Sequence, residues 1–164
     1  MGRLGSTRQR LRVEEAATKL YRPKGNSDGF QLSERWPELD RVGPYQEYAP
    51  GSVLARQSLA VMEVFFIERG LVKLKRLDDG GRKEVVGLRT PGWILGAAAA
   101  ILQRPHPATI ETVTRCYLRT IPAADFCHLM KTNTQFSWYV AMLHSQELYD
   151  HVAQVTCLAY LSSR

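Results

Sequence analysis

Short stretches rich in strand-forming apolar residues, separated by turn-forming residues, follow one another through the middle of the chain. The stretches are SVLARQ, EVFFIERG, LVKLKRL and KEVVGLR, between residues 52 and 89. In the third, Val72 and Leu74 alternate with Lys73 and Lys75, as in a strand with one buried face. The DDGG sequence that follows supplies the positive-φ residues of a tight hairpin. The pattern therefore predicts antiparallel strands joined by hairpins.

A second pair of strands is expected in ATIETVTRCYLRTI, residues 108–121, where apolar residues again mix with polar ones. A helix is then expected to open at residues 122–125. Its apolar face is formed by Phe126, Leu129 and Met130.

The last segment, from about Thr134 to Leu161, contains no Gly or Pro and is too long for a strand, so it is predicted to be a helix. It carries two apolar stripes, the first Phe136, Tyr139, Val140 and Leu143, the second Leu148, Val152, Val155 and Ala159. We predict that the first stripe packs on the strands of its own chain and that the second is a dimer interface with the same helix of another subunit. The alternative is that both stripes pack on the chain's own strands.

The chain has 164 residues, 45% of which are hydrophobic, and this length and composition predict one domain with a hydrophobic core. The formal net charge of +6 is concentrated in residues 1–24. We therefore expect residues 1–30 to be a basic, flexible arm that ends at the GNSDG sequence, and the folded body to start near Gln31. In that body LSERWPELDRVGP is expected to form short helical turns.

Neither an apolar stretch of about 20 residues nor a signal-peptide core is present, so we expect a cytoplasmic protein with no membrane partner. The three cysteines, Cys116, Cys127 and Cys157, are far apart and form no C-x-x-C pair. They are expected to be buried, reduced thiols rather than disulfides or metal ligands.

One stretch does not fit a plain strand or helix: GAAAAILQRPHPATI, residues 96–110. Four alanines after a glycine predict a short helix, and Pro105 and Pro107 stop it. With the preceding leucine, LGAAAAILQRPHPATI is similar without gaps to F-G-E-L-A-L-I-x-x-x-P-R-A-A-T-V, the phosphate-binding cassette of cyclic-nucleotide-binding domains. The chain thus resembles the effector domain of the Crp/Fnr transcription regulators.

Three further motifs carry the same resemblance, in the same order along the chain. YAPGSVLARQ is similar to Y-x-x-G-x-x-L-x-x-Q, VFFIERGLVKL to L-Y-x-I-x-x-G-x-V-x-V, and LRTPGWILG to L-x-x-G-D-x-x-G. The resemblance covers about residues 40–164. It implies an α+β fold in which an antiparallel double-stranded β-helix, a jelly-roll-like β-roll, is flanked by N-terminal helices and a long C-terminal dimerisation helix.

The resemblance also implies a ligand site in the cassette, formed by Gly96, Ala97, Ala98, Ala99, His106, Pro107 and Ala108. A short helix with unpaired N–H groups and small side chains suits a phosphate. In the family a Glu holds the ribose hydroxyl and an Arg neutralises the cyclic phosphate, but here Ala97 and His106 take those places. We therefore expect no ordinary cAMP binding and leave the effector unidentified.

Two other sensor types remain open as alternatives: a genuine cyclic-nucleotide site, and a haem-based gas sensor with His106 or His151 as ligand. The resemblance places His151 and Val152 of the long helix near the ligand. A cupin-like metalloenzyme is the rival from another class. It needs an H-x-H pair, and none of the four histidines forms one, so we predict that the protein is not an enzyme and holds no metal.

The resemblance finally implies partners and a division of the chain. Residues 31–133 would be the cyclic-nucleotide-binding-like β-roll, and residues 134–164 the dimerisation helix and hinge of a homodimer. The family continues into a winged helix-turn-helix that binds DNA, a part not contained in these residues. A small-molecule effector would act on the DNA-binding parts through the helix.

Overall fold

A computed structural model describes residues 43–162 of the chain, and these form two compact units that divide between Cys127 and His128. The first unit contains the strands β1 Tyr45–Tyr48, β2 Val53–Ala55, β3 Glu63–Arg69, β4 Val72–Leu77, β5 Lys83–Arg89, β6 Ile94–Leu95, β7 Thr109–Thr112 and β8 Cys116–Pro122. The short helix α4, Ala97–Leu102, lies between β6 and β7. Helix α5, Ala123–Thr132, spans the division, and α6, Thr134–Ser162, belongs to the second unit.

The strands form two antiparallel four-stranded sheets. The first has the order β1-β8-β3-β6 and the second the order β2-β7-β4-β5. In the first sheet Phe66 is opposite Arg119, and in the second Leu74 is opposite Ile110. Chain neighbours such as β7 and β8 lie in different sheets, which makes the arrangement a β-sandwich or roll rather than a simple meander.

Residues from both sheets form the hydrophobic core. Its central cluster consists of Phe65, Ile67, Val72, Trp93, Leu95, Ile110, Cys116 and Leu118. On β4 the alternation predicted from the sequence is observed, because Val72 is fully buried and Leu74 packs on this cluster while Lys73 and Lys75 reach Glu111 on β7. These two ammonium groups lower the pKa of the Glu111 carboxyl by hydrogen bonding to it.

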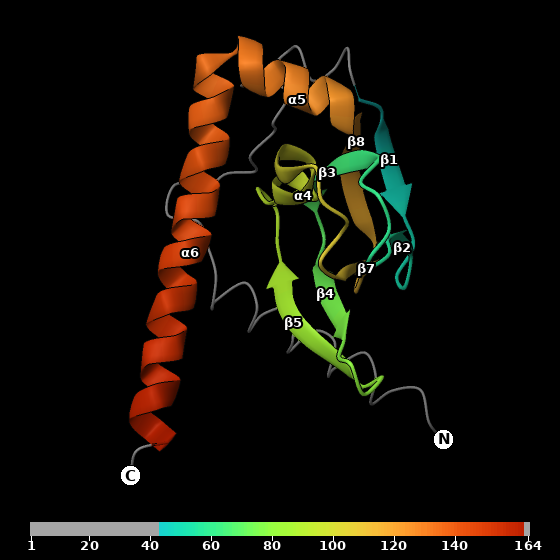
Figure 1. Cartoon of the computed structure of the whole chain (residues 1–164). Coiled ribbons are helices and arrows are strands. Elements are labelled where there is room, and N and C mark those ends of the chain that lie inside the picture. The colour runs from blue at the N-terminus through green and yellow to red at the C-terminus, as the bar shows by residue number, and fades with distance from the viewer. Residues whose placement is uncertain (1–42, 163–164) are drawn as a thin grey trace, which may run out of the picture. The chain divides into compact units, whose positions relative to one another are not determined.

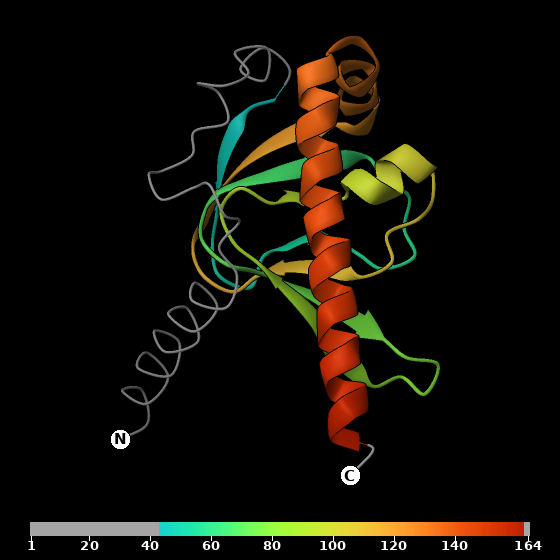
Figure 2. The same ribbon diagram turned by 90° about the vertical axis from the view of Figure 1, so that its left-hand side faces the viewer.

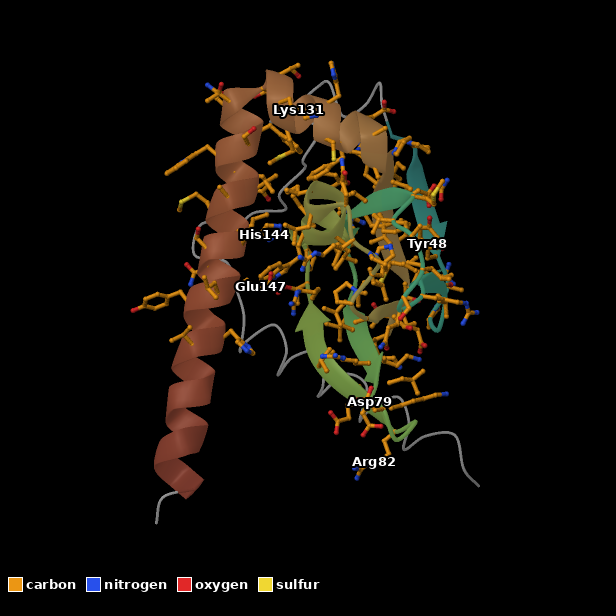
Figure 3. All side chains as sticks on the ribbon, viewed as in Figure 1. Tyr48, Asp79, Arg82, Lys131, His144 and Glu147 are labelled. Carbon is orange, nitrogen blue, oxygen red and sulfur yellow. The ribbon has the colours of Figure 1, made fainter. Side chains whose placement is uncertain are left out.

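The hairpin predicted at DDGG joins β4 and β5 (Figure 1). The Asp78 N–H donates to the Arg82 carbonyl at 3.0 Å, and Gly81 takes a positive φ of 77°. Asp78 also accepts the Arg82 N–H through its side chain at 2.8 Å. Figure 2 shows this turn projecting away from the other strands, and Figure 3 labels Asp79 and Arg82 at its tip.

The predicted strands in residues 52–89 and 108–121 are confirmed, as is the helix that follows Pro122. Two strands were not predicted. β1 has the sequence YQEY, in which three of four residues are exposed, and β6 has only two residues, so neither carries a periodic signal. The arm at residues 1–30 and the helical turns expected before Pro44 lie outside the described residues.

The second unit is dominated by α6, a helix of 29 residues that begins at Thr134, where the sequence indicated. The Asn133 side chain accepts the Phe136 N–H at 2.9 Å and so caps the start of the helix. Phe136, Val140 and Leu143 of the first predicted stripe are buried, and Tyr139 is partly so. No helix in the described part of the chain is both long and apolar enough to cross a membrane.

Gly70, in the turn between β3 and β4, generates a prediction about stability. Its φ is +101°, and a Cβ built there would lie 2.6 Å from both the Arg115 carbonyl oxygen and the Cys116 Sγ. Gly70→Ala is therefore expected to lower the free energy of unfolding by about 3 kcal/mol, since backbone strain and a clash add up.

Gly51→Ala is the control, because Gly51 has a φ of +83° but nothing within 4 Å of the added Cβ. It should cost about 1 kcal/mol. Urea unfolding of both variants measures the difference, and equal costs would contradict the packing described for Gly70.

Candidate functional site

Residues 95–110 are called the cassette below. They contain the short helix α4, which is flanked by two residues with a left-handed backbone conformation. Gly96 caps the start of α4 with a φ of 82°, and Gln103 ends it with a φ of 53°. The Ala100 N–H donates to the Gly96 carbonyl at 2.9 Å, and the Arg104 N–H to the Ala99 carbonyl at 3.0 Å. No side chain caps the first turn of α4. The helix lies beside β3 (Figure 1).

The sequence-predicted cassette residues divide into buried and exposed positions. Ala97, Ala99, His106 and Ala108 are buried, and Ala98 and Pro107 are exposed. Ala97, at the position where the family pattern has its Glu, is 1% exposed and has no polar group to offer. The buried polar side chain of the cassette is therefore that of His106, which is 5% exposed.

Two backbone hydrogen bonds fix His106 to the segment before β3. Its N–H donates to the Leu59 carbonyl at 2.9 Å, and its carbonyl accepts the Ser58 N–H at 2.8 Å. These bonds hold the cassette against residues 58–59. The Cε1 atom of that ring would lie 3.3 Å from a Cβ added to Gly96, so a larger residue at position 96 would crowd the imidazole.

The His106 ring lines a cavity of about 260 Å³, called the cassette cavity below. Most of its wall is apolar and comes from β2, β3 and the residues between them: Val53, Leu54, Ala55, Leu59, Ala60, Met62 and Phe65. Arg56 and Glu63 also line it, and both are exposed to solvent. The cavity thus has an apolar wall, one buried imidazole, and a single charge of each sign among its exposed lining residues.

Burial lowers the pKa of His106 from its ordinary value, because the charged imidazolium loses hydration in the protein. The ordinary value is about 6.5, so the ring is neutral at pH 7. A neutral imidazole offers one N–H donor and one nitrogen acceptor, and it does not neutralise an anion. This electrostatic state differs from that of a permanently charged guanidinium at the same position.

A second, larger cavity of about 630 Å³ lies on another side of the cassette. Ala99 and Ala100 of α4 and Ala123 and Ala124 of α5 line it, together with residues before β3 and after α4: Ser58, Ala60, Val61, Gln103, Arg104 and Pro105. The Cys127 thiol also lines it and donates to the Ala100 carbonyl at 3.7 Å. The alanine run thus leaves open space between the two helices.

The long-helix residues predicted as site or interface residues lie on α6. His151, Val152 and Leu148 are exposed, and the side chains of Val155 and Ala159 lie outside the described part. The structure adds three exposed residues that the sequence analysis did not assign to an interface, namely Trp138, Met142 and Tyr149. Trp138, Met142, Tyr149 and Val152, at spacings of four, seven and three residues, form a row that faces away from the buried stripe, and each is more than half exposed. This row, with Leu148 beside it, is called the exposed row below.

Residues 45–133, more than half of the chain, match the cyclic nucleotide-binding domain family. The chain therefore belongs to this family, which is one of regulatory ligand-binding domains rather than of enzymes. A comparison with curated proteins found no match. Among the described residues, no group of three or more His, Cys, Asp or Glu side chains is placed to hold a metal ion.

Solved structures give the same fold. A Silicibacter pomeroyi protein described as a candidate cAMP-binding regulator is 28% identical, with a TM-score of 0.58, over 74% of this chain and 56% of its own. The Thermus thermophilus catabolite activator protein is 19% identical, with a TM-score of 0.65, over 80% of this chain and 61% of its own. The sensor domain of the transcriptional regulator DNR from Pseudomonas aeruginosa is 17% identical, with a TM-score of 0.59, over 87% of this chain and 93% of its own.

These neighbours include transcription regulators of the Crp/Fnr family, as the sequence motifs indicated. The chain spans little more than half the length of the first two proteins and nearly all of the DNR sensor domain. At identities below 20%, the similarity to the catabolite activator protein and to DNR is evidence of a shared fold.

The buried state of His106 predicts a dependence of stability on pH. Because its pKa is lowered on folding, the unfolded chain takes up a proton below about pH 6.5 while the folded chain does not. Stability is then lost as the pH falls from 6.5 toward the folded-state pKa, by at most about 1.4 kcal/mol per pH unit for this one group. His106→Phe removes this contribution and keeps His128, His144 and His151. Urea unfolding at pH 7 and pH 5 should show a smaller loss for the variant than for the wild type, and equal losses would contradict the assignment.

Proposed function

We propose that the chain is the effector-sensing and dimerisation domain of a Crp/Fnr-type transcription regulator, and that its cassette lacks the polar anchors for a cyclic nucleotide. The family match and the fold support the first part of this proposal. We also propose that the two four-stranded sheets correspond to the double-stranded β-helix of such domains. The helix from residue 134 would be the dimerisation element.

The observation that carries the second part is the pair Ala97 and His106. One side chain is a buried methyl group and the other a buried imidazole that is neutral at pH 7. Breaking a shielded Arg–phosphate pair costs roughly 2 to 5 kcal/mol, which is more than tenfold in affinity. A cyclic phosphate in the cassette cavity would lack that partner.

Arg56 is the reason to keep genuine cyclic-nucleotide binding as a second candidate. Arg56 and His106 both line the cassette cavity, so a cation-bearing residue belongs to the same site. Because Arg56 is exposed, water screens its charge, and an ion pair there contributes far less than a buried one. We therefore rank this candidate second.

The exposed row of α6 supports the dimerisation part. Soluble monomers rarely expose several large apolar side chains on one helix face, whereas two helices related by a two-fold axis would cover one another's exposed rows. An effector or a partner would then act by changing the angle between the paired helices. That angle would set the spacing of DNA-binding domains attached beyond residue 164.

The anchor proposal predicts that calorimetric titration with cAMP or cGMP gives no binding at micromolar concentration. The double variant Ala97→Glu with His106→Arg should bind cAMP at least about tenfold more tightly than the wild type, since it restores both polar groups. Thermal unfolding of the variant checks that the buried Glu is tolerated. Tight cAMP binding by the wild type would refute the proposal, and its loss in Arg56→Ala would then favour the second candidate.

The dimer proposal predicts a dimer at micromolar concentration in sedimentation experiments. Leu148→Glu with Val152→Glu should weaken association at least about a hundredfold, because carboxylates replace apolar contacts and repel each other across the axis. Gln135→Glu with Gln146→Glu adds the same charge outside the exposed row and should leave the dimer intact. A monomeric wild type, or equal effects of the two variants, would contradict pairing through this row.

A further inference from the structure

The cassette cavity contains one uncharged polar side chain, that of His106, which is 5% exposed. Among the described residues the His106 ring has no hydrogen-bond partner, and its nitrogens are not among the fully enclosed polar atoms that lack one, so they remain accessible to a small molecule. Buried polar side chains in folded proteins nearly always have a hydrogen-bond partner. The ring lines the cassette cavity, so a molecule in the cavity can supply that partner.

The wall of the cavity determines which kind of molecule fits. Apart from His106, Arg56 and Glu63, the residues that line it are apolar, and among them Phe65 is 2% exposed and Met62 75% exposed. An anion placed there would lose hydration and meet a neutral imidazole, which is unfavourable. The two charged lining residues, Arg56 and Glu63, are exposed and opposite in sign, so they give the cavity no net charge.

The volume of the cassette cavity limits the size of a ligand that it can hold. Sites for drug-sized ligands have volumes of about 300 to 1,000 Å³, and the cassette cavity, with about 260 Å³, lies just below that range. A molecule of one ring with a short substituent is of suitable size. Its apolar body would contact Leu54, Met62 and Phe65, and one polar group would meet His106.

We propose that the cassette cavity binds a small, uncharged, mainly apolar molecule that carries one hydrogen-bonding group directed at His106. This inference rests on the proposed function, because it names the class of effector for the same site. Such a ligand would satisfy the buried imidazole without requiring it to become charged. Ala97 and His106, which stand in place of the phosphate anchors, would then give the site a preference for a different class of ligand.

Three probes of similar size test this ligand class: benzyl alcohol, toluene and benzoate. They share one ring and differ in having a hydroxyl, no polar group, or a negative charge. Binding to the wild-type chain at pH 8 is followed by the NMR signals of the Met62 methyl group and the His106 Cε1–H. We expect benzyl alcohol to bind at least about tenfold more tightly than benzoate, and more tightly than toluene, since only the alcohol gives the imidazole a neutral partner.

Two variants assign the preference to His106. His106→Phe should bind benzyl alcohol and toluene equally, because the ring volume is kept and the hydrogen bond is lost. His106→Arg should reverse the order and prefer benzoate, because it introduces a permanent positive charge. If either variant fails to fold, the order of the three probes on the wild type still decides.

The inference is overturned if none of the probes shifts the Met62 and His106 signals, or if benzoate binds the wild type as tightly as benzyl alcohol. A wild type that binds none of them but remains dimeric and does not bind cAMP would overturn this inference alone. Tight cAMP binding would instead overturn the proposed function. The two failures are therefore distinguishable in one set of titrations.

Discussion

The two backbone hydrogen bonds between His106 and the 58–59 segment are the constraint on which the candidate site depends. They join a segment that precedes β3 to one that follows α4, across nearly fifty residues of sequence. Because both bonds use main-chain atoms, they are independent of the side chain at position 106. The backbone of the cassette can therefore be retained while its side chains change, and the chemistry of the cavity then depends on residues such as Ala97 and His106.

The strands and helices could be predicted from the sequence where the pattern repeats. β4 alternates apolar and polar residues, β3 contains the apolar run VFFI, both strands end at glycine-containing turns, and α6 has no helix breaker over 29 residues. β1 and β6 were missed because exposed or very short strands leave no periodic signal. The sheet order could not be obtained from the pattern, since it depends on pairings between distant strands such as β1 with β8.

The candidate site shows the same limit. The cassette motif located His106 and the alanines, because they are consecutive in sequence and match a known pattern. The opposite wall, with Arg56, Glu63 and Phe65, comes from separate segments that only the folded sheets bring together. On α6 the sequence predicted an interface at Leu148 and Val152, and it remains a prediction, since a stripe with steps of three and four can be drawn in more than one way. Trp138, Met142 and Tyr149 were distinguished only by their exposure.

The strand β5 has a consequence for how this protein resists aggregation through the edge of its second sheet. Among residues 43–162 it pairs with β4 alone, so it is an edge strand, and Val85 and Val86 are both exposed on it. Such an edge is a template on which another extended chain can add itself. Here Lys83, Glu84 and Arg89 place charges along the strand, Gly87 interrupts its side chains, and a bulge disturbs the pairing opposite Lys75. Charged side chains, a glycine and a bulge at an edge strand disfavour pairing with a strand of another molecule. They therefore counteract the tendency of the exposed Val85 and Val86 to promote aggregation.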